Sequence, residues 1–232
     1  MQCKKIIILA NDTNVGKTWL GCELLARARE HNLRLFPFKP LATGDRSDAL
    51  RLAAASCCVL DLNKINPIFF HSPMAPYAAS AIEGREISWE QIEAALQEVE
   101  KNSHAVLIET AGGILTPCDQ STNMVDLVKR WNAVAVLVVP NKLGTITQAR
   151  TALEILLQRK ISPLAVVLNN IPKNNDLLAT DQDPFLETIR KSNFAILKDY
   201  FPKIPFFEST NYELDNLWNL IKLRLTQSNW KT

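Results

Sequence analysis

Apolar residues gather in six short runs along the chain, several of them without polar alternation and rich in β-branched side chains. Uninterrupted runs of this length are typical of strands that are buried on both faces, as in a parallel sheet. The predicted strands cover residues 5–10, 35–39, 105–109, 133–140, 164–169 and 204–207.

Helical patterns lie between these runs, so strand and helix alternate along the chain. The predicted helices cover residues 18–29, 48–56, 89–101, 147–158, 184–191 and 212–225. Capping signals mark three of the helix starts, namely Ser88 with Gln91, Thr210 with Glu213, and Asp183 before Pro184. The alternation predicts an α/β fold, a doubly wound and mostly parallel sheet flanked by helices, whose ligands bind at the carboxyl ends of the strands.

Composition narrows the class of protein. A chain of 232 residues, 47% of them hydrophobic, can bury one sizeable core, so we expect a single domain over residues 1–232. A net charge of +2 without a long run of Lys and Arg argues against a nucleic-acid partner. The five cysteines include no C-x-x-C pair, which suits a reducing compartment. The amino end has the pattern of neither a signal peptide nor a membrane span, so we expect a cytoplasmic protein without a membrane partner.

The first predicted strand runs into a polar segment at residues 10–18, ANDTNVGKT, and a helix follows. Strand, loop and helix stand in the order that a phosphate-binding P-loop requires. In that interpretation Gly16 lets backbone N–H groups approach phosphate oxygens, Lys17 reaches the β and γ phosphates, and the Thr18 hydroxyl holds Mg²⁺. Asn11 occupies the position of the usual first glycine. A capped turn without a ligand is the alternative.

Charged residues near other strand ends extend this candidate site. Glu109 ends a predicted strand, where P-loop proteins commonly place a second carboxylate on the metal side, and Asp48 opens the second predicted helix. Together with Thr18 they would offer Mg²⁺ the oxygen ligands that it prefers. Lys39, at the end of a buried strand, is costly unless an anion meets it, although a lysine that extends to solvent is the alternative.

Four short segments share an order and spacing along the chain. They are D-T-x-V-G-K-T at residues 12–18, F-K-P-x-A-T-G at 38–44, E-x-A-G-G at 109–113 and K-L-G at 142–144. As a set they resemble the dethiobiotin synthetase family, and the similarity extends to about residue 207. The resemblance implies a P-loop NTPase fold and an enzyme of biotin biosynthesis. It would convert 7,8-diaminopelargonic acid and CO₂ to dethiobiotin with ATP and Mg²⁺.

The same resemblance implies roles for individual residues. Lys17 and Lys39 would be catalytic, because they face the carbamate and the transferred phosphoryl group. Mg²⁺ would be bound by Thr18, Asp48 and Glu109. The nucleotide would contact Asn14, Val15, Gly16, Lys17, Thr18, Glu109, Thr110, Ala111, Gly112, Asn169, Asn170, Pro205, Phe206 and Phe207. The substrate would contact Thr13, Thr43, Gly144, Thr145 and Thr147, the last three from the neighbouring subunit of a homodimer.

Four positions depart from the family pattern. Ala10 replaces a glycine, Asn14 stands where an acidic residue is common, Thr110 replaces a glycine, and Asn170 replaces an acid. We expect these departures to affect rate and nucleotide preference more than fold.

Other functions of P-loop proteins are open from the sequence. A partitioning or regulatory ATPase commonly has a second lysine early in its phosphate loop, and residues 11–14 contain none. A GTPase would use Asn141 and Lys142 to begin an N-K-x-D motif, but Gly144 takes the place of the acid. An inactive nucleotide-binding module, suggested by Ala10 and Thr110, is a third alternative.

Overall fold

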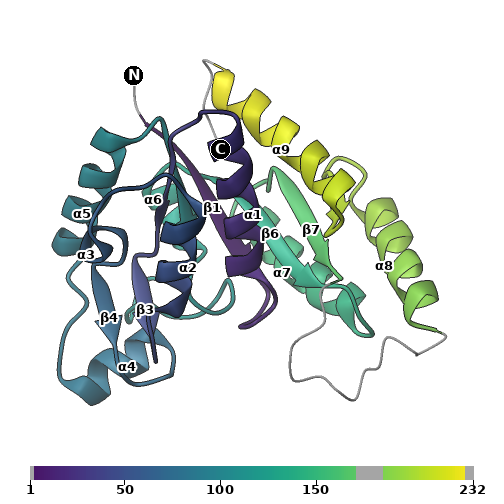
Figure 1. Cartoon of the computed structure of the whole chain (residues 1–232). Coiled ribbons are helices and arrows are strands. Elements are labelled where there is room, and N and C mark those ends of the chain that lie inside the picture. Colours follow the sequence, from purple (N-terminus) through teal and green to yellow (C-terminus); the bar gives the residue numbers. More distant parts are fainter. Residues whose placement is uncertain (1–2, 171–184, 228–232) are drawn as a thin grey trace.

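A six-stranded parallel sheet forms the centre of the computed structural model, which describes residues 3–170 and 185–227 (Figure 1). Its strands are β1 (Lys4–Ala10), β2 (Leu35–Phe38), β5 (Ala105–Glu109), β6 (Val134–Pro140), β7 (Ala165–Asn169) and β8 (Phe206–Glu208). The strand order is β2-β5-β1-β6-β7-β8, with β1 paired to β5 on one side and to β6 on the other. This sheet, flanked by helices, confirms the predicted fold class.

Helices cover both faces of the sheet. Successive side chains of each strand point to opposite faces, and apolar side chains on both faces must be buried. Along β1, Ile6 and Ile8 pack in the core of one face, while Ile7 and Leu9 pack in the core of the other. The first face carries α1 (Lys17–Glu30), α2 (Ser47–Ala55) and α9 (Asn211–Thr226). The second carries α5 (Trp89–Asn102), α6 (Asp126–Arg130), α7 (Thr145–Gln158) and α8 (Leu186–Tyr200). Close packing on both faces gives the loops at the strand ends a rigid support.

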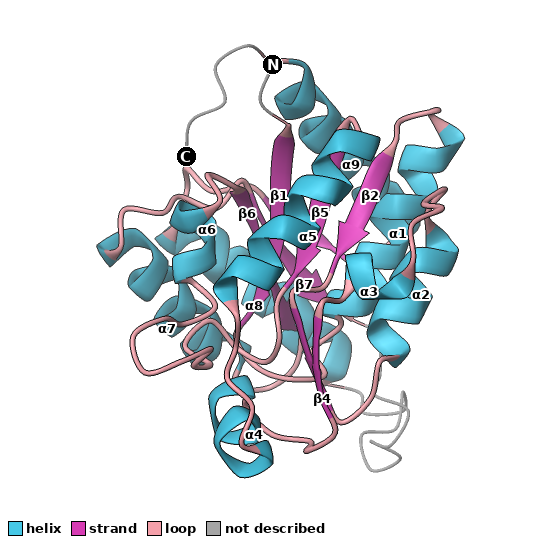
Figure 2. Cartoon of the chain, turned by 90° about the vertical axis from the view of Figure 1, so that its left-hand side faces the viewer, coloured by secondary structure: helices cyan, strands magenta, loops and turns pink. Residues whose placement is uncertain are grey.

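A second, two-stranded sheet was not predicted. Its parallel strands are β3 (Leu41–Thr43) and β4 (Ile68–Phe70), and the short helices α3 (Leu62–Ile65) and α4 (Pro76–Glu83) accompany them. In Figure 2, β4 and α4 lie at the lower end of the molecule, below the strands of the large sheet. Elements this short give no periodic apolar signal, so the sequence could not reveal them.

The predicted elements are confirmed, and a boundary differs by two residues or more at three of them. The helix expected from residue 147 begins at Thr145, because Gly144 takes φ +91° and the Thr145 hydroxyl accepts a hydrogen bond from the Lys142 N–H at 2.9 Å. The helix expected at 184–191 is α8, which extends to Tyr200, and its Asp183–Pro184 start signal lies outside the described residues. The last strand begins at Phe206, two residues later than expected. None of the helices described is long and apolar enough to cross a membrane.

The Ser88 cap provides a test of the link between sequence and fold. The Ser88 hydroxyl accepts a hydrogen bond from the Gln91 N–H at 3.1 Å, which satisfies one of the free donors at the start of α5. We expect Ser88→Ala to lower the free energy of unfolding by about 1 kcal/mol in urea titrations, and Ser88→Asp to retain it. Equal stability of Ser88→Ala and the unchanged protein would contradict this assignment.

Candidate active site

The phosphate loop, residues 10–18, turns sharply at Gly16 between β1 and α1. Gly16 has φ +105°, a conformation that favours glycine, and it stands at the start of α1. A Cβ at this position would lie 2.0 Å from the side-chain nitrogen of Asn169, which donates to the Val15 carbonyl at 2.8 Å. The end of β7 therefore packs directly on the phosphate loop and leaves room only for glycine. Asn14 also takes a positive φ of +57°, which asparagine tolerates better than most residues.

Two departures from the family pattern are absorbed by the core. Ala10 is fully buried, and it is not among the described residues with positive φ, so its methyl group requires no unusual backbone. Thr110 is also fully buried, and its hydroxyl donates to the Ile8 carbonyl at 2.9 Å. The Thr110 side chain thus binds β1 and does not line the large cavity described below.

Lys17 directs its ammonium group at backbone carbonyls around the phosphate loop. Nζ donates to the carbonyl oxygens of Gly112 at 2.8 Å and Asp12 at 3.2 Å. Burial, and the nearby positive charge of Lys39, lower the pKa of Lys17 to about 8. Neutral carbonyls are weaker partners for this charge than phosphate oxygens would be, so Lys17 is suited to meet an anion.

Four predicted residues, Thr18, Lys39, Asp48 and Glu109, meet in what we call the charge cluster. The Lys39 ammonium forms ion pairs with Glu109 and with Asp48, the second at 3.1 Å. The Thr18 hydroxyl donates to the same Glu109 oxygen at 3.0 Å. Lys39 is 4% exposed and Glu109 is fully buried, so both charges are largely removed from water. Residues from the ends of β2 and β5 and the starts of α1 and α2 thereby converge on one point.

The charge cluster keeps Lys39 protonated. Burial alone would lower the pKa of Lys39, but the charges of Glu109 and Asp48 and their hydrogen bonds outweigh burial and raise it. Burial would likewise raise the pKa of Asp48, but the ammonium of Lys39 holds it below its usual value. The two lysines of the site therefore differ, since only the pKa of Lys17 is lowered.

A cavity of about 720 Å³ opens at the carboxyl ends of the central strands. The predicted residues that line it are Thr13, Asn14, Gly16, Lys17, Thr18, Lys39, Thr43, Asp48, Glu109, Ala111, Gly112 and Asn169. The sequence interpretation missed Trp19, Ala42, Asp45, Ser47 and Arg51, which line the same cavity. A signal for Arg51 existed, because a residue three positions after Asp48 lies on the same face of a helix.

The oxygen atoms of the charge cluster fit a bound Mg²⁺. The Glu109 Oε2 atom is buried and has no hydrogen-bond partner among the described residues, although its Oε1 atom has two. An orphaned carboxylate oxygen beside a hydroxyl and a second carboxylate is the donor set of a hard cation. In the described part of the chain, no group of three or more His, Cys, Asp or Glu residues could hold a metal ion. Mg²⁺ would thus take its remaining ligands from phosphates and water.

An amide network occupies the ends of β6, β7 and β8. The Glu208 carboxylate accepts hydrogen bonds from the side-chain amides of Asn141 at 3.3 Å and Asn170 at 3.2 Å. The other end of the Asn141 amide accepts from Asn193 of α8 at 2.9 Å. Asn141 is therefore held inside the protein at both ends of its amide, which together with Gly144 argues against a guanine-reading N-K-x-D motif.

Several predicted site residues do not line the large cavity, namely Val15, Thr110, Gly144, Thr145, Thr147, Asn170, Pro205, Phe206 and Phe207. Val15, Thr145 and Phe206 are buried, and the Thr145 hydroxyl donates to the Pro140 carbonyl at 2.5 Å. The start of α7 is joined to the phosphate loop by the side chain of Asn11, which donates to Gln148 at 2.9 Å.

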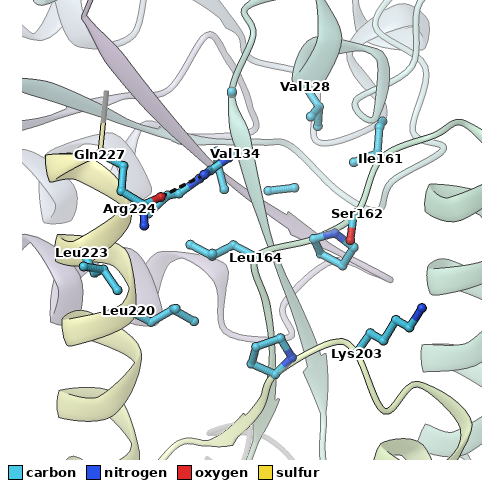
Figure 3. A pocket seen from close by; sticks show the side chains of 14 residues that line it. Val128, Val134, Ile161, Ser162, Leu164, Lys203, Leu220, Leu223, Arg224 and Gln227 are labelled. Carbon is cyan, nitrogen blue, oxygen red and sulfur yellow. Dashed lines mark hydrogen bonds between the residues drawn. The ribbon is translucent and has the colours of Figure 1, made fainter. Parts of the chain in front are cut away.

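Pro205 instead lines a second cavity of about 420 Å³, at the amino ends of β6 and β7 (Figure 3). Figure 3 shows Leu164, Leu220 and Leu223 around this cavity, with Lys203 and Arg224 on opposite sides. The two cavities lie at opposite ends of the parallel strands. This second cavity therefore gives no support to the predicted contact between Pro205 and the nucleotide, which stays a prediction.

The parallel sheet and the phosphate loop between its inner strand β1 and helix α1 define a P-loop nucleotide-binding protein. The chain is 32% identical over 168 residues to an ATP-dependent dethiobiotin synthetase of Akkermansia muciniphila, covering 72% of this chain and 79% of that one. It is 33% identical over 176 residues to an ATP-dependent dethiobiotin synthetase of Escherichia coli, covering 72% and 78%. The chain belongs to the dethiobiotin synthetase family.

Two broader comparisons concern the fold. A family profile described as "AAA domain" matches residues 4–202. Among solved structures, a DUF1611 family protein from Anabaena variabilis superposes with a TM-score of 0.52 and 14% identity, over 96% of this chain and 58% of that one. At this identity the likeness shows a shared fold alone.

The lowered pKa of Lys17 predicts a pH dependence of nucleotide binding. Phosphate attracts only the protonated lysine, so affinity is greatest below a pH of about 8 and falls as the pH rises through that value. Lys39 keeps its charge in the same window, because its pKa is raised. We expect calorimetry with ADP to show this loss, and we expect Lys17→Arg, which stays charged, to bind with little change across the window. A pH-independent affinity in the unchanged protein would contradict the assignment.

The buried pair of Lys39 and Glu109 predicts a coupled effect on stability. Glu109→Gln leaves the Lys39 charge buried with Asp48 as its remaining acid, and we expect it to lower the free energy of unfolding by about 3 kcal/mol. Adding Lys39→Met removes the stranded charge, so the double variant should regain part of this loss. Urea titrations of the two single variants and of the double variant measure the coupling, and strictly additive losses would contradict it.

Proposed function

We propose that this chain is an ATP-dependent dethiobiotin synthetase that acts on 7,8-diaminopelargonic acid and CO₂. The observation that carries the proposal is the placement of Lys39. Its ammonium lines the same cavity as the phosphate loop and Lys17, so two cations face the space in which a carbamate and a γ phosphate would meet. The family membership supplies the substrate class.

The proposed reaction has three steps. One amine of the substrate attacks CO₂ and loses a proton, which gives a carbamate. A carbamate oxygen attacks the γ phosphorus of ATP, the bond from that phosphorus to the bridging oxygen breaks, and ADP leaves. The second amine then attacks the carbonyl carbon of the carbamic-phosphoric anhydride. The bond from this carbon to the anhydride oxygen breaks, and phosphate leaves with the oxygen that came from the carbamate. The amine loses a proton as the cyclic urea closes.

Positioning and charge stabilisation would supply most of the catalysis. Lys17 would contact the β and γ phosphates, and Lys39 would hold the carbamate oxygens and the γ-phosphoryl group during transfer. Thr13 and Thr43, which line the cavity, would contact the diamine. The carboxamide of Asn169 would lie toward the nucleoside, on the far side of the phosphate loop from the charge cluster.

The charge cluster would also hold the metal ion, through Thr18, Asp48 and Glu109. Mg²⁺, when bound, would neutralise the charge that develops on the β and γ phosphates. The unpartnered Glu109 oxygen supports this assignment. Lys39 would then pair with substrate anions in place of the carboxylates that it contacts in the structure described here.

A homodimer is part of the proposal. The start of α7, at Gly144, Thr145 and Thr147, does not line the large cavity of its own chain. Backbone N–H groups at a helix start attract anions. In a dimer, this start would bind the distant carboxylate of a substrate held in the partner's cavity.

The proposed function is tested by ADP and phosphate release from Mg²⁺-ATP and bicarbonate, with and without the diamine. Release that depends on the diamine, with a product of the mass of dethiobiotin, would support the proposal. Nucleotide binding without diamine-dependent release would favour the alternatives, a partitioning-type ATPase or an inactive nucleotide-binding module.

Lys39→Ala separates nucleotide binding from chemistry. Since Lys39 faces the transferred group and not the nucleoside, we expect the variant to keep most of its ADP affinity, measured by calorimetry. We expect its diamine-dependent rate to fall by about a hundredfold to a thousandfold. Lys64→Ala, which removes an exposed lysine at the end of α3, is the matched control. A folded Lys39→Ala protein with an unchanged rate would remove Lys39 from the mechanism.

A further inference from the structure

The backbone of Lys39 is held by a part of the chain that no motif marked. Lys39 follows the last residue of β2, so no strand pairing fixes it. Its N–H instead donates to the Ile65 carbonyl at 2.8 Å, and its carbonyl accepts from the side-chain amide of Asn66 at 2.7 Å. The peptide groups on both sides of Lys39 are therefore fixed by the end of α3.

The helix that carries Asp48 is fixed to the same asparagine. Arg46, at the start of α2, donates from Nε to the Asn66 side-chain oxygen at 2.9 Å and from its guanidinium to the Asn66 carbonyl at 2.7 Å. Asn66 thus holds Lys39 with its amide nitrogen and α2 with its oxygens. Lys39 and Asp48 meet at 3.1 Å between these two attachments.

Asn66 is suited to a fixed position. It is 1% exposed, and its side-chain nitrogen also donates to the Ile68 carbonyl at 3.0 Å, at the start of β4. Both polar atoms of the Asn66 side chain are therefore hydrogen-bonded, and a 180° flip of its amide group would break all three hydrogen bonds. Buried amide groups that are fully hydrogen-bonded hold their neighbours in one arrangement.

We infer that Asn66 is a positioning residue for the reaction. It sets where the Lys39 ammonium stands relative to Asp48, and it acts through the Lys39 backbone and through Arg46, without contact to substrate. The inference rests on the proposed function, because it concerns the geometry of Lys39 during phosphoryl transfer. In this inference the small second sheet supports Lys39, because Asn66 joins α3 to β4 of that sheet.

The variant that isolates this role is Asn66→Asp. An ionised aspartate has the size of asparagine and still accepts from Arg46, but it cannot donate to the Lys39 carbonyl. We expect kcat for diamine-dependent ADP release to fall by about a hundredfold, as for a small displacement of a reacting group. The Kd for ADP should change by less than about twofold, because Asn66 does not contact the phosphate loop.

Asn63→Ala is the matched control. Asn63 lies in α3, just before Asn66, and accepts from the Arg46 guanidinium at 2.9 Å, but among the described residues no hydrogen bond joins it to Lys39. We expect its kcat to stay within about twofold of the unchanged protein. Arg46→Met provides a second variant if Asn66→Asp does not fold, and it should lower kcat with the Kd for ADP unchanged.

A readout independent of turnover completes the test. Crystal structures of the unchanged and Asn66→Asp proteins, in one crystal form, should show the Lys39 ammonium moved away from Asp48. A kcat of Asn66→Asp equal to that of Asn63→Ala, or an unmoved Lys39, would overturn the inference. If the unchanged protein shows no diamine-dependent turnover, the proposed function is contradicted. In that case the position of the Lys39 ammonium in the two crystal structures alone decides whether Asn66 positions Lys39.

Discussion

The burial of the Lys39 ammonium against the Glu109 carboxylate is the constraint on which the site depends. A buried ion pair gives little net stability compared with apolar packing, and losing one partner leaves a stranded charge. In the proposed function, an incoming anion would pair with the ammonium and a metal ion with the carboxylate. In that function, the position of the pair between the ends of β2 and β5 would also determine where the anion binds, because the Lys17 ammonium and the phosphate loop face the same cavity.

The rest of the fold holds this pair in place. The parallel sheet brings the carboxyl ends of β1, β5 and β7 to one edge, so the phosphate loop, Glu109 and Asn169 become neighbours. The close approach of Asn169 to Gly16 fixes the loop from one side. The small sheet and α3 fix Lys39 from the other, through Asn66. Rigid support of this kind is what a reaction that depends on positioning requires.

The sequence predicted the elements and motifs that depend on local pattern. It did not predict the features of the site that depend on contacts between residues far apart in the chain. The apolar run of β1 and the following G-K-T indicated a P-loop, because spacing alone carries that signal. Lys39 could be selected as an unusual charge at a strand end, but its ion pairs with Glu109 and Asp48 depend on the strand order, which the sequence does not state. Asn66 was missed because its importance lies only in what it contacts. The three-residue strand β4, which follows it, was too short to give a signal.

The central claim, that the γ-phosphoryl group moves from ATP to a carbamate oxygen, is tested most directly with bicarbonate labelled with heavy oxygen. The reaction is mixed rapidly with Mg²⁺-ATP and the diamine, and stopped before the label exchanges with water. The account predicts that the released phosphate carries one heavy oxygen, observed by mass spectrometry, and only when the diamine is present. Unlabelled phosphate alongside diamine-dependent ADP formation would mean that water, and not the carbamate, accepts the phosphoryl group, and would contradict the account.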